Sequence, residues 1–112
     1  MTDKRATLLA EVDNRRDELI ALTHDLVRMP TLNPPGVGYR EICDYLADRL
    51  ARRQFECIFV RAVETPGDSE KYPRWNVIAR REGATPGECV HFNSHIDVVE
   101  VGHGWTTDPL PG

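Results

Sequence analysis

The sequence predicts an α/β fold in which two helices are followed by three strands. Apolar residues recur at helical spacing in residues 3–29 and 39–53, and they alternate or run together in residues 55–63, 75–81 and 88–94. Proline, glycine and charged residues separate these segments. Helices that precede a sheet favour layered packing, and sheets of this kind usually bind ligands at the carboxyl ends of their strands.

The composition is that of one small globular domain. The 112 residues are 40% hydrophobic and 29% charged, and 14 Lys and Arg against 18 Asp and Glu leave a net charge of −4. This balance argues against a nucleic-acid partner or an anionic membrane surface. The longest apolar runs, residues 19–22 and 57–60, are far too short for a membrane span or a signal peptide. We therefore expect a soluble, cytoplasmic protein.

Two segments have the spacing of amphipathic helices. In residues 3–29, five apolar side chains fall on one face at steps of three, four or seven residues: Leu8, Val12, Leu19, Leu22 and Leu26. Thr2 or Asp3 caps this helix, and Pro30 ends it. The second helix, residues 39–53, follows from a four-residue spacing of its apolar side chains: Ile42, Leu46 and Leu50.

Three segments are predicted to be strands. Residues 55–63 carry apolar side chains on both faces, which predicts a strand covered on both sides. Residues 75–81 and 88–94 form two further strands on either side of a turn at 82–87. The third strand ends near His95.

The three cysteines predict reduced, buried thiols. Cys43, Cys57 and Cys89 form an odd set without a C-x-x-C pair. Such a set favours neither a disulfide framework nor a structural zinc site.

The segment most informative about function is HFNSHIDVV, residues 91–99. In an extended chain His91, Asn93, His95 and Asp97 lie on one face, where they are costly to bury unless they pair or coordinate a ligand. A neutral imidazole at His95 can bind zinc through one ring nitrogen while the Asp97 carboxylate accepts a hydrogen bond from the other. The spacing alone favours a hydrogen-bonded structural pair over a functional site, and a catalytic zinc ion needs three protein ligands, of which no convincing second and third are seen in the sequence.

Three stretches of the chain together are far more specific than this pair. They are MPTLNPPG at 29–36, WNVIA at 75–79, and SHIDVV at 94–99 followed by GWTTDPL at 104–110. In this order they resemble segments of the zinc-dependent amidohydrolases and peptidases that include acetylornithine deacetylase, succinyl-diaminopimelate desuccinylase, aminoacylase and the glutamate-releasing carboxypeptidases.

The resemblance implies that residues 1–112 are the N-terminal portion of a three-layer, zinc-peptidase-like catalytic domain. It matches His95 to the first zinc ligand of the family and Asp97 to the catalytic carboxylate that holds this ligand. The remaining groups of the family are a bridging Asp, a Glu pair with the general base, a further carboxylate and a late His. They are expected beyond Gly112, so the chain is expected to be a truncated fragment that is inactive alone.

For the full-length protein, the resemblance implies a metal-dependent hydrolase that cleaves an amide bond of an N-acyl amino acid or small peptide. One or two zinc ions are expected, with cobalt as a substitute, and a homodimer formed through a later lid domain. The alternative is a noncatalytic interaction or regulatory domain that ends naturally at Gly112. A reading frame that continues into a glycine-rich, Asp-containing segment and then Glu-Glu would favour the enzyme.

Overall fold

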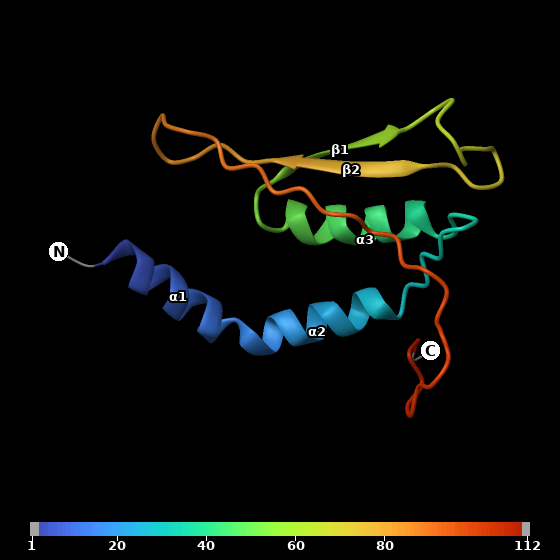
Figure 1. Cartoon of the computed structure of the whole chain (residues 1–112). Helices are drawn as coiled ribbons and strands as arrows, with labels where there is room; N and C mark the ends of the chain where they lie inside the picture. Colours follow the sequence, from blue (N-terminus) through green and yellow to red (C-terminus); the bar gives the residue numbers. More distant parts are fainter. Residues whose placement is uncertain (1–2, 111–112) are drawn as a thin grey trace. The chain divides into compact units, whose positions relative to one another are not determined.

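The computed structural model of the chain describes residues 3–110. They form two compact units, one of residues 3–28 with Leu110 and the other of residues 29–109. Three helices precede two strands along this part of the chain (Figure 1).

The first unit contains two helices, α1 (Lys4–Asn14) and α2 (Arg16–Val27), so the prediction of one continuous helix is wrong. Arg15 separates them with φ −99° and ψ 12°. Residues 13–17 are all polar, so no apolar side chain packs there to hold the helix straight, and Asp and Asn are weak helix formers. Asp3 caps α1 by accepting a hydrogen bond from the amide of Arg5 at 3.0 Å, whereas Thr2 lies outside the described residues.

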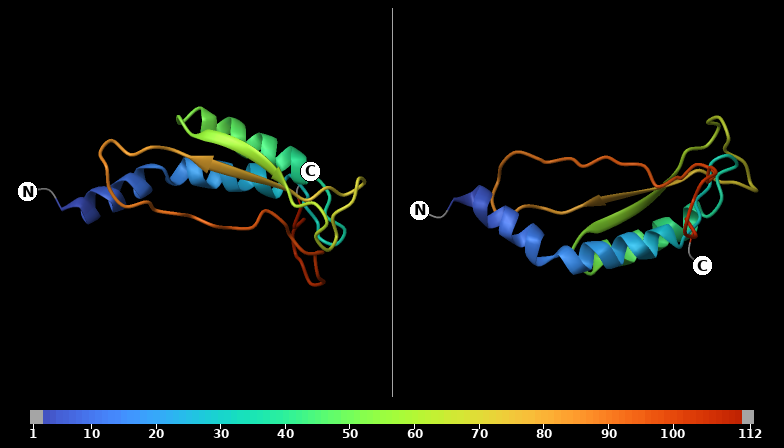
Figure 2. Two further views of the ribbon diagram at one scale, coloured as in Figure 1. Left: turned by 90° about the horizontal axis from the view of Figure 1, so that it is seen from above. Right: turned by 60° about the horizontal axis from the view of Figure 1, so that its bottom comes forward.

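The second unit packs helix α3 (Tyr39–Ala51) against a hairpin of β1 (Glu56–Arg61) and β2 (Trp75–Arg80), as Figures 1 and 2 show. These bounds confirm the predicted second helix and first two strands. The strands pair antiparallel, with Ile58 opposite Ile78. The apolar core lies on α3, where four side chains are buried: Tyr39, Ile42, Cys43 and Ala47.

The sheet differs from the predicted one in two ways. Residues 88–94 form no strand, and the side chains of Val90 and Phe92 are 75% and 90% exposed. A strand needs a neighbour to satisfy its backbone hydrogen bonds, and no described segment pairs with this one. The outer face of β1 is also uncovered, because Ile58 and Val60 lie exposed on it while α3 covers the other face.

The cysteines are free, but they are not equally buried. Cys43 is fully buried in α3, Cys57 is half-buried and Cys89 is exposed. The prediction of buried thiols therefore holds for Cys43 and is wrong for Cys89, which lies in the unpaired segment. Burial raises the pKa of the Cys43 thiol, because desolvation disfavours the thiolate.

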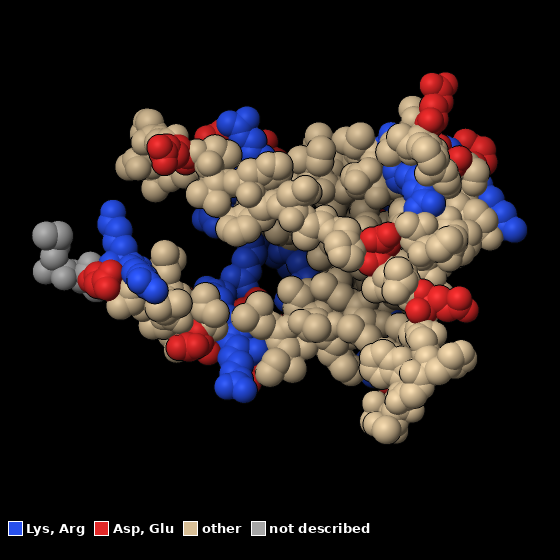
Figure 3. Space-filling model, viewed as in Figure 1, with Lys and Arg blue, Asp and Glu red and all other residues tan. Residues whose placement is uncertain are grey.

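Both signs of charge occur at the surface. Figure 3 shows Lys and Arg as well as Asp and Glu on the face that it draws. Within residues 3–110, none of the helices has the length and apolar character needed to cross a membrane.

Candidate metal centre

Two stretches far apart in the sequence meet beside the His-x-Asp motif. The amide of Asn33 donates to the carbonyl of Val98 and the amide of Val98 donates to the carbonyl of Thr31, both at 2.9 Å. These bonds form a parallel bridge between Leu32 and Val98. The Thr31 hydroxyl, 1% exposed, donates to the carbonyl of Ile96. The MPTLNPPG stretch thus holds the backbone that carries the motif.

The structure brings His95 and Asp97 together as a hydrogen-bonded pair. Nδ1 of His95 lies 2.8 Å from Oδ1 of Asp97 and 3.0 Å from the backbone carbonyl oxygen of the same residue. A carboxylate and a carbonyl only accept hydrogen bonds, so Nδ1 carries the proton. In the neutral ring the lone pair is then on Nε2, the atom available to a metal. The His95 side chain is 84% exposed.

Asp97 is held in its ionised form. Nδ2 of Asn33 donates to Oδ2 of Asp97 at 2.9 Å, while His95 occupies Oδ1. The hydrogen bond from Asn33 and, after it, that from His95 lower the pKa of the Asp97 carboxyl, although partial burial opposes them. An anionic acceptor strengthens its hold on an imidazole, so Asp97 is suited to orient a metal-binding ring.

The side chains around His95 supply one metal ligand. His91 and Asn93, predicted to share a face with His95, lie exposed in the unpaired segment. No group of three His, Cys, Asp or Glu residues in the described part of the chain could hold a metal ion. The residues therefore fit the role of one histidine ligand with its carboxylate, and they do not make a complete zinc site.

Two residues beside the motif were not predicted from the sequence. Asn33 contacts Asp97 directly, and Nη1 of Arg74 donates to Oδ1 of Asn33 at 3.0 Å. Asn33 lies in one of the stretches that carry the family resemblance, which was the available signal. Arg74 immediately precedes another, WNVIA.

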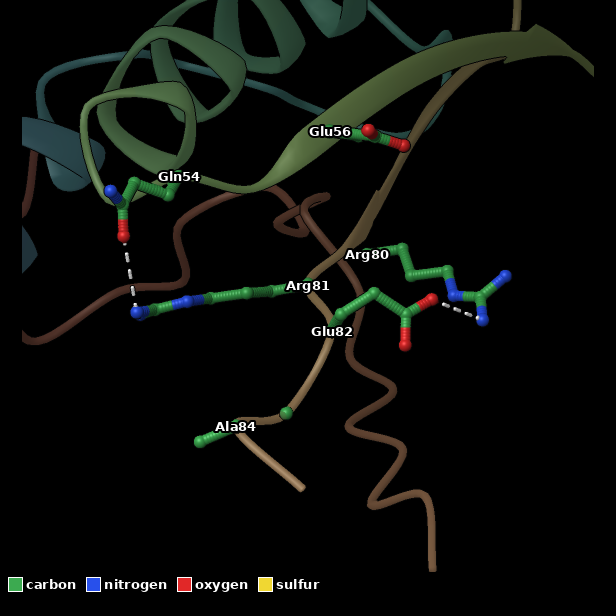
Figure 4. Close-up of a pocket in the computed structure, with 7 residues that line it drawn as sticks. Gln54, Glu56, Arg80, Arg81, Glu82 and Ala84 are labelled. Carbon is green, nitrogen blue, oxygen red and sulfur yellow. Dashed lines mark hydrogen bonds and ion pairs between the residues drawn. The ribbon is translucent and has the colours of Figure 1, made fainter. Parts of the chain in front are cut away.

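A hollow in another part of the second unit offers no alternative site. Seven residues line it (Figure 4): Gln54, Glu56, Arg80, Arg81, Glu82, Gly83 and Ala84. Arg81 donates to the neutral side-chain amide of Gln54 at 3.3 Å, and Arg80 forms an ion pair with Glu82 at 2.7 Å. Both side chains of the Arg80–Glu82 pair are largely exposed, which leaves water free to screen them.

Comparison with known proteins finds similarity to succinyl-diaminopimelate desuccinylases. The chain is 36% identical over 95 residues to a succinyl-diaminopimelate desuccinylase of Cereibacter sphaeroides, and 36% identical over 92 residues to that of Rhodospirillum rubrum. A desuccinylase of Ralstonia nicotianae is 34% identical over 93 residues. These alignments cover 81–83% of this chain.

The chain spans only 21–23% of the length of these relatives. No protein-family model matches it, and no solved structure does. The chain is thus similar to about a fifth of the length of several succinyl-diaminopimelate desuccinylases.

Proposed function

We propose that the chain is part of the catalytic domain of a zinc-dependent hydrolase that removes an acyl group, such as a succinyl group, from an amino acid derivative. The observation that carries this proposal is the His95–Asp97 pair, which leaves Nε2 of an exposed imidazole for a metal, in a chain similar to desuccinylases. In this proposal the remaining ligands and the general base would come from the part of the relatives' length that the chain does not span.

Each described residue has a definite task in this proposal. His95 would hold one ion through Nε2, and Asp97 would fix the ring and its tautomer through Nδ1. The bridge between Leu32 and Val98 would keep the motif in place on the second unit. When bound, zinc polarises the carbonyl of the scissile amide and makes water a usable nucleophile near neutral pH, and cobalt can replace it.

The proposal is tested on the protein encoded by the whole reading frame that contains this chain. Hydrolysis of N-succinyl and N-acetyl amino acids and small peptides is measured with added zinc or cobalt. We expect metal-dependent release of amine, with His95→Ala losing it and His91→Ala, an exposed histidine nearby, retaining it. Absence of hydrolysis with every substrate and metal, or full activity in His95→Ala, would refute the proposal.

A further inference from the structure

The orientation of the Asn33 side-chain amide is fixed by what lies on its two sides. Arg74 has only donors, so the oxygen of the amide must face it, at 3.0 Å from Nη1. The nitrogen of the amide then faces Oδ2 of Asp97 at 2.9 Å, where only an acceptor lies. A flipped amide would place its NH₂ group against a guanidinium and its oxygen against a carboxylate, and both contacts would be repulsive.

Arg74 is itself held by several groups. Its Nη1 also donates to the hydroxyl of Tyr39 at 2.8 Å, and its Nη2 donates to the carbonyl of Pro35 at 3.3 Å. Its backbone amide donates to Asp68 at 2.9 Å. Tyr39 is only 7% exposed, so the hydroxyl that accepts the hydrogen bond from Arg74 belongs to a buried residue of α3.

Two glycines let separate loops close around the guanidinium of Arg74. Gly36 and Gly67 both have positive φ, +103° and +87°. A Cβ on Gly36 would lie 2.9 Å from Nη1, and one on Gly67 would lie 2.2 Å from Nη2. Only residues without a side chain permit this approach, so the loops enclose the guanidinium and restrict its movement.

We propose that Arg74 is a positioning residue for the candidate metal ligand: it orients the Asn33 amide, which holds Asp97, which in turn sets the ring orientation and tautomer of His95. The link to metal binding rests on the proposed function, but the chain of hydrogen bonds does not. In this arrangement the guanidinium is linked to the imidazole through Asn33 and Asp97. Removal of either the Asn33 or the Arg74 side chain should therefore weaken the preference of His95 for the tautomer with its proton on Nδ1.

The tautomer of His95 is the direct readout. We would record long-range ¹H–¹⁵N correlations of the neutral imidazole in the chain. The expected wild-type form carries its proton on Nδ1. In Arg74→Met and in Asn33→Ala the ratio of the Nδ1–H to the Nε2–H form should fall, by up to about tenfold, the change expected if the His95–Asp97 hydrogen bond were lost completely. In the double variant Arg74→Met should add nothing to Asn33→Ala.

Matched controls separate this effect from general destabilisation. Arg80→Met and Asn76→Ala change the same residue types at exposed positions of β2 and should leave the ratio unchanged. Exchange protection of the Val98 amide reports whether the backbone bridge to Thr31 persists. Asn33→Asp keeps an acceptor for Arg74 and replaces the donor to Asp97 with a second acceptor. It should therefore lower the ratio even if Arg74→Met fails to fold.

The outcomes distinguish the two proposals. A wild-type ratio in folded Asn33→Asp, or additive effects of Arg74→Met and Asn33→Ala, would overturn the positioning role. A zinc titration of the protein from the whole reading frame tests the other claim. If zinc leaves the His95 signals of wild type unchanged while the variants alter the tautomer, the metal function fails and the positioning role stands.

Discussion

The substitution Thr31→Val tests whether the MPTLNPPG stretch holds the His-x-Asp segment in place. The Thr31 side chain is 1% exposed, and its hydroxyl donates to the carbonyl of Ile96, next to His95. Valine has nearly the same shape but cannot donate. The variant therefore removes one buried hydrogen bond and leaves the Ile96 carbonyl without this donor.

The expected cost follows from burial. A buried group left without its partner loses about 1–3 kcal/mol, and we take about 2 kcal/mol for the second unit. For a domain of this size that corresponds to a fall in melting temperature of about 10 °C. Thr23→Val is the matched control, because Thr23 also donates to a carbonyl, that of Leu19 at 2.8 Å, but lies exposed on α2. Its cost should stay within about 0.5 kcal/mol.

Urea unfolding of both variants measures these costs, followed by the fluorescence of Trp75 and Trp105 for the second unit and by the far-ultraviolet circular dichroism of the helices for α2. Hydrogen exchange at the Val98 amide shows whether the bridge to Thr31 opens more often in Thr31→Val. Equal costs for Thr31→Val and Thr23→Val, or unchanged exchange at Val98, would refute the proposed anchoring of the motif.

Two further predictions concern the residues around Arg74. Hydrogen bonds from the Arg61 side chain and then from the backbone amide of Arg74 lower the pKa of the Asp68 carboxyl in the folded chain. The stabilisation that they give is therefore fully present above the usual carboxyl pKa of about 3.9. It is lost as the pH falls through the lower pKa of the folded state. Asp68→Asn should flatten this acid dependence of thermal unfolding, and an unaltered dependence would contradict the assignment. Gly67→Ala should cost about 1 kcal/mol or more in urea unfolding, because φ is positive and the new methyl group would meet the guanidinium of Arg74. Gly87→Ala, where a Cβ meets nothing within 4 Å in the described chain, should cost little, and equal costs would argue against the enclosure.

Local patterns predicted the elements whose partners lie close in the sequence. The four-residue spacing of Ile42, Leu46 and Leu50 predicted α3 because that face packs on the adjacent hairpin. Residues 88–94 have the composition of a strand but no described neighbour, and a strand forms only when another backbone pairs with it. Helices α1 and α2 are separated at Arg15, where residues 13–17 are all polar. The regular spacing of apolar residues on either side predicted one continuous helix and gave no sign of this break.

The same limit applies to the candidate metal centre. His95 and Asp97 are two residues apart, so their pairing could be proposed from spacing and family resemblance, and the structure shows the hydrogen bond. Asn33 contacts Asp97 across 64 positions, and Arg74 contacts Asn33 across 41. Periodicity describes only near neighbours in the sequence, so neither contact could be predicted before the fold was known.

The central claim is that His95 binds a metal ion and that Asp97 orients the imidazole ring of His95. The zinc affinity of the protein, measured by equilibrium dialysis, tests this claim most directly. The protein from the whole reading frame would be compared with His95→Ala, Asp97→Asn and the control His91→Ala at equal folded fraction. We expect His95→Ala to lose zinc, Asp97→Asn to bind it about 10- to 100-fold more weakly, and His91→Ala to bind as wild type does. Zinc binding by His95→Ala at the wild-type affinity would contradict the account.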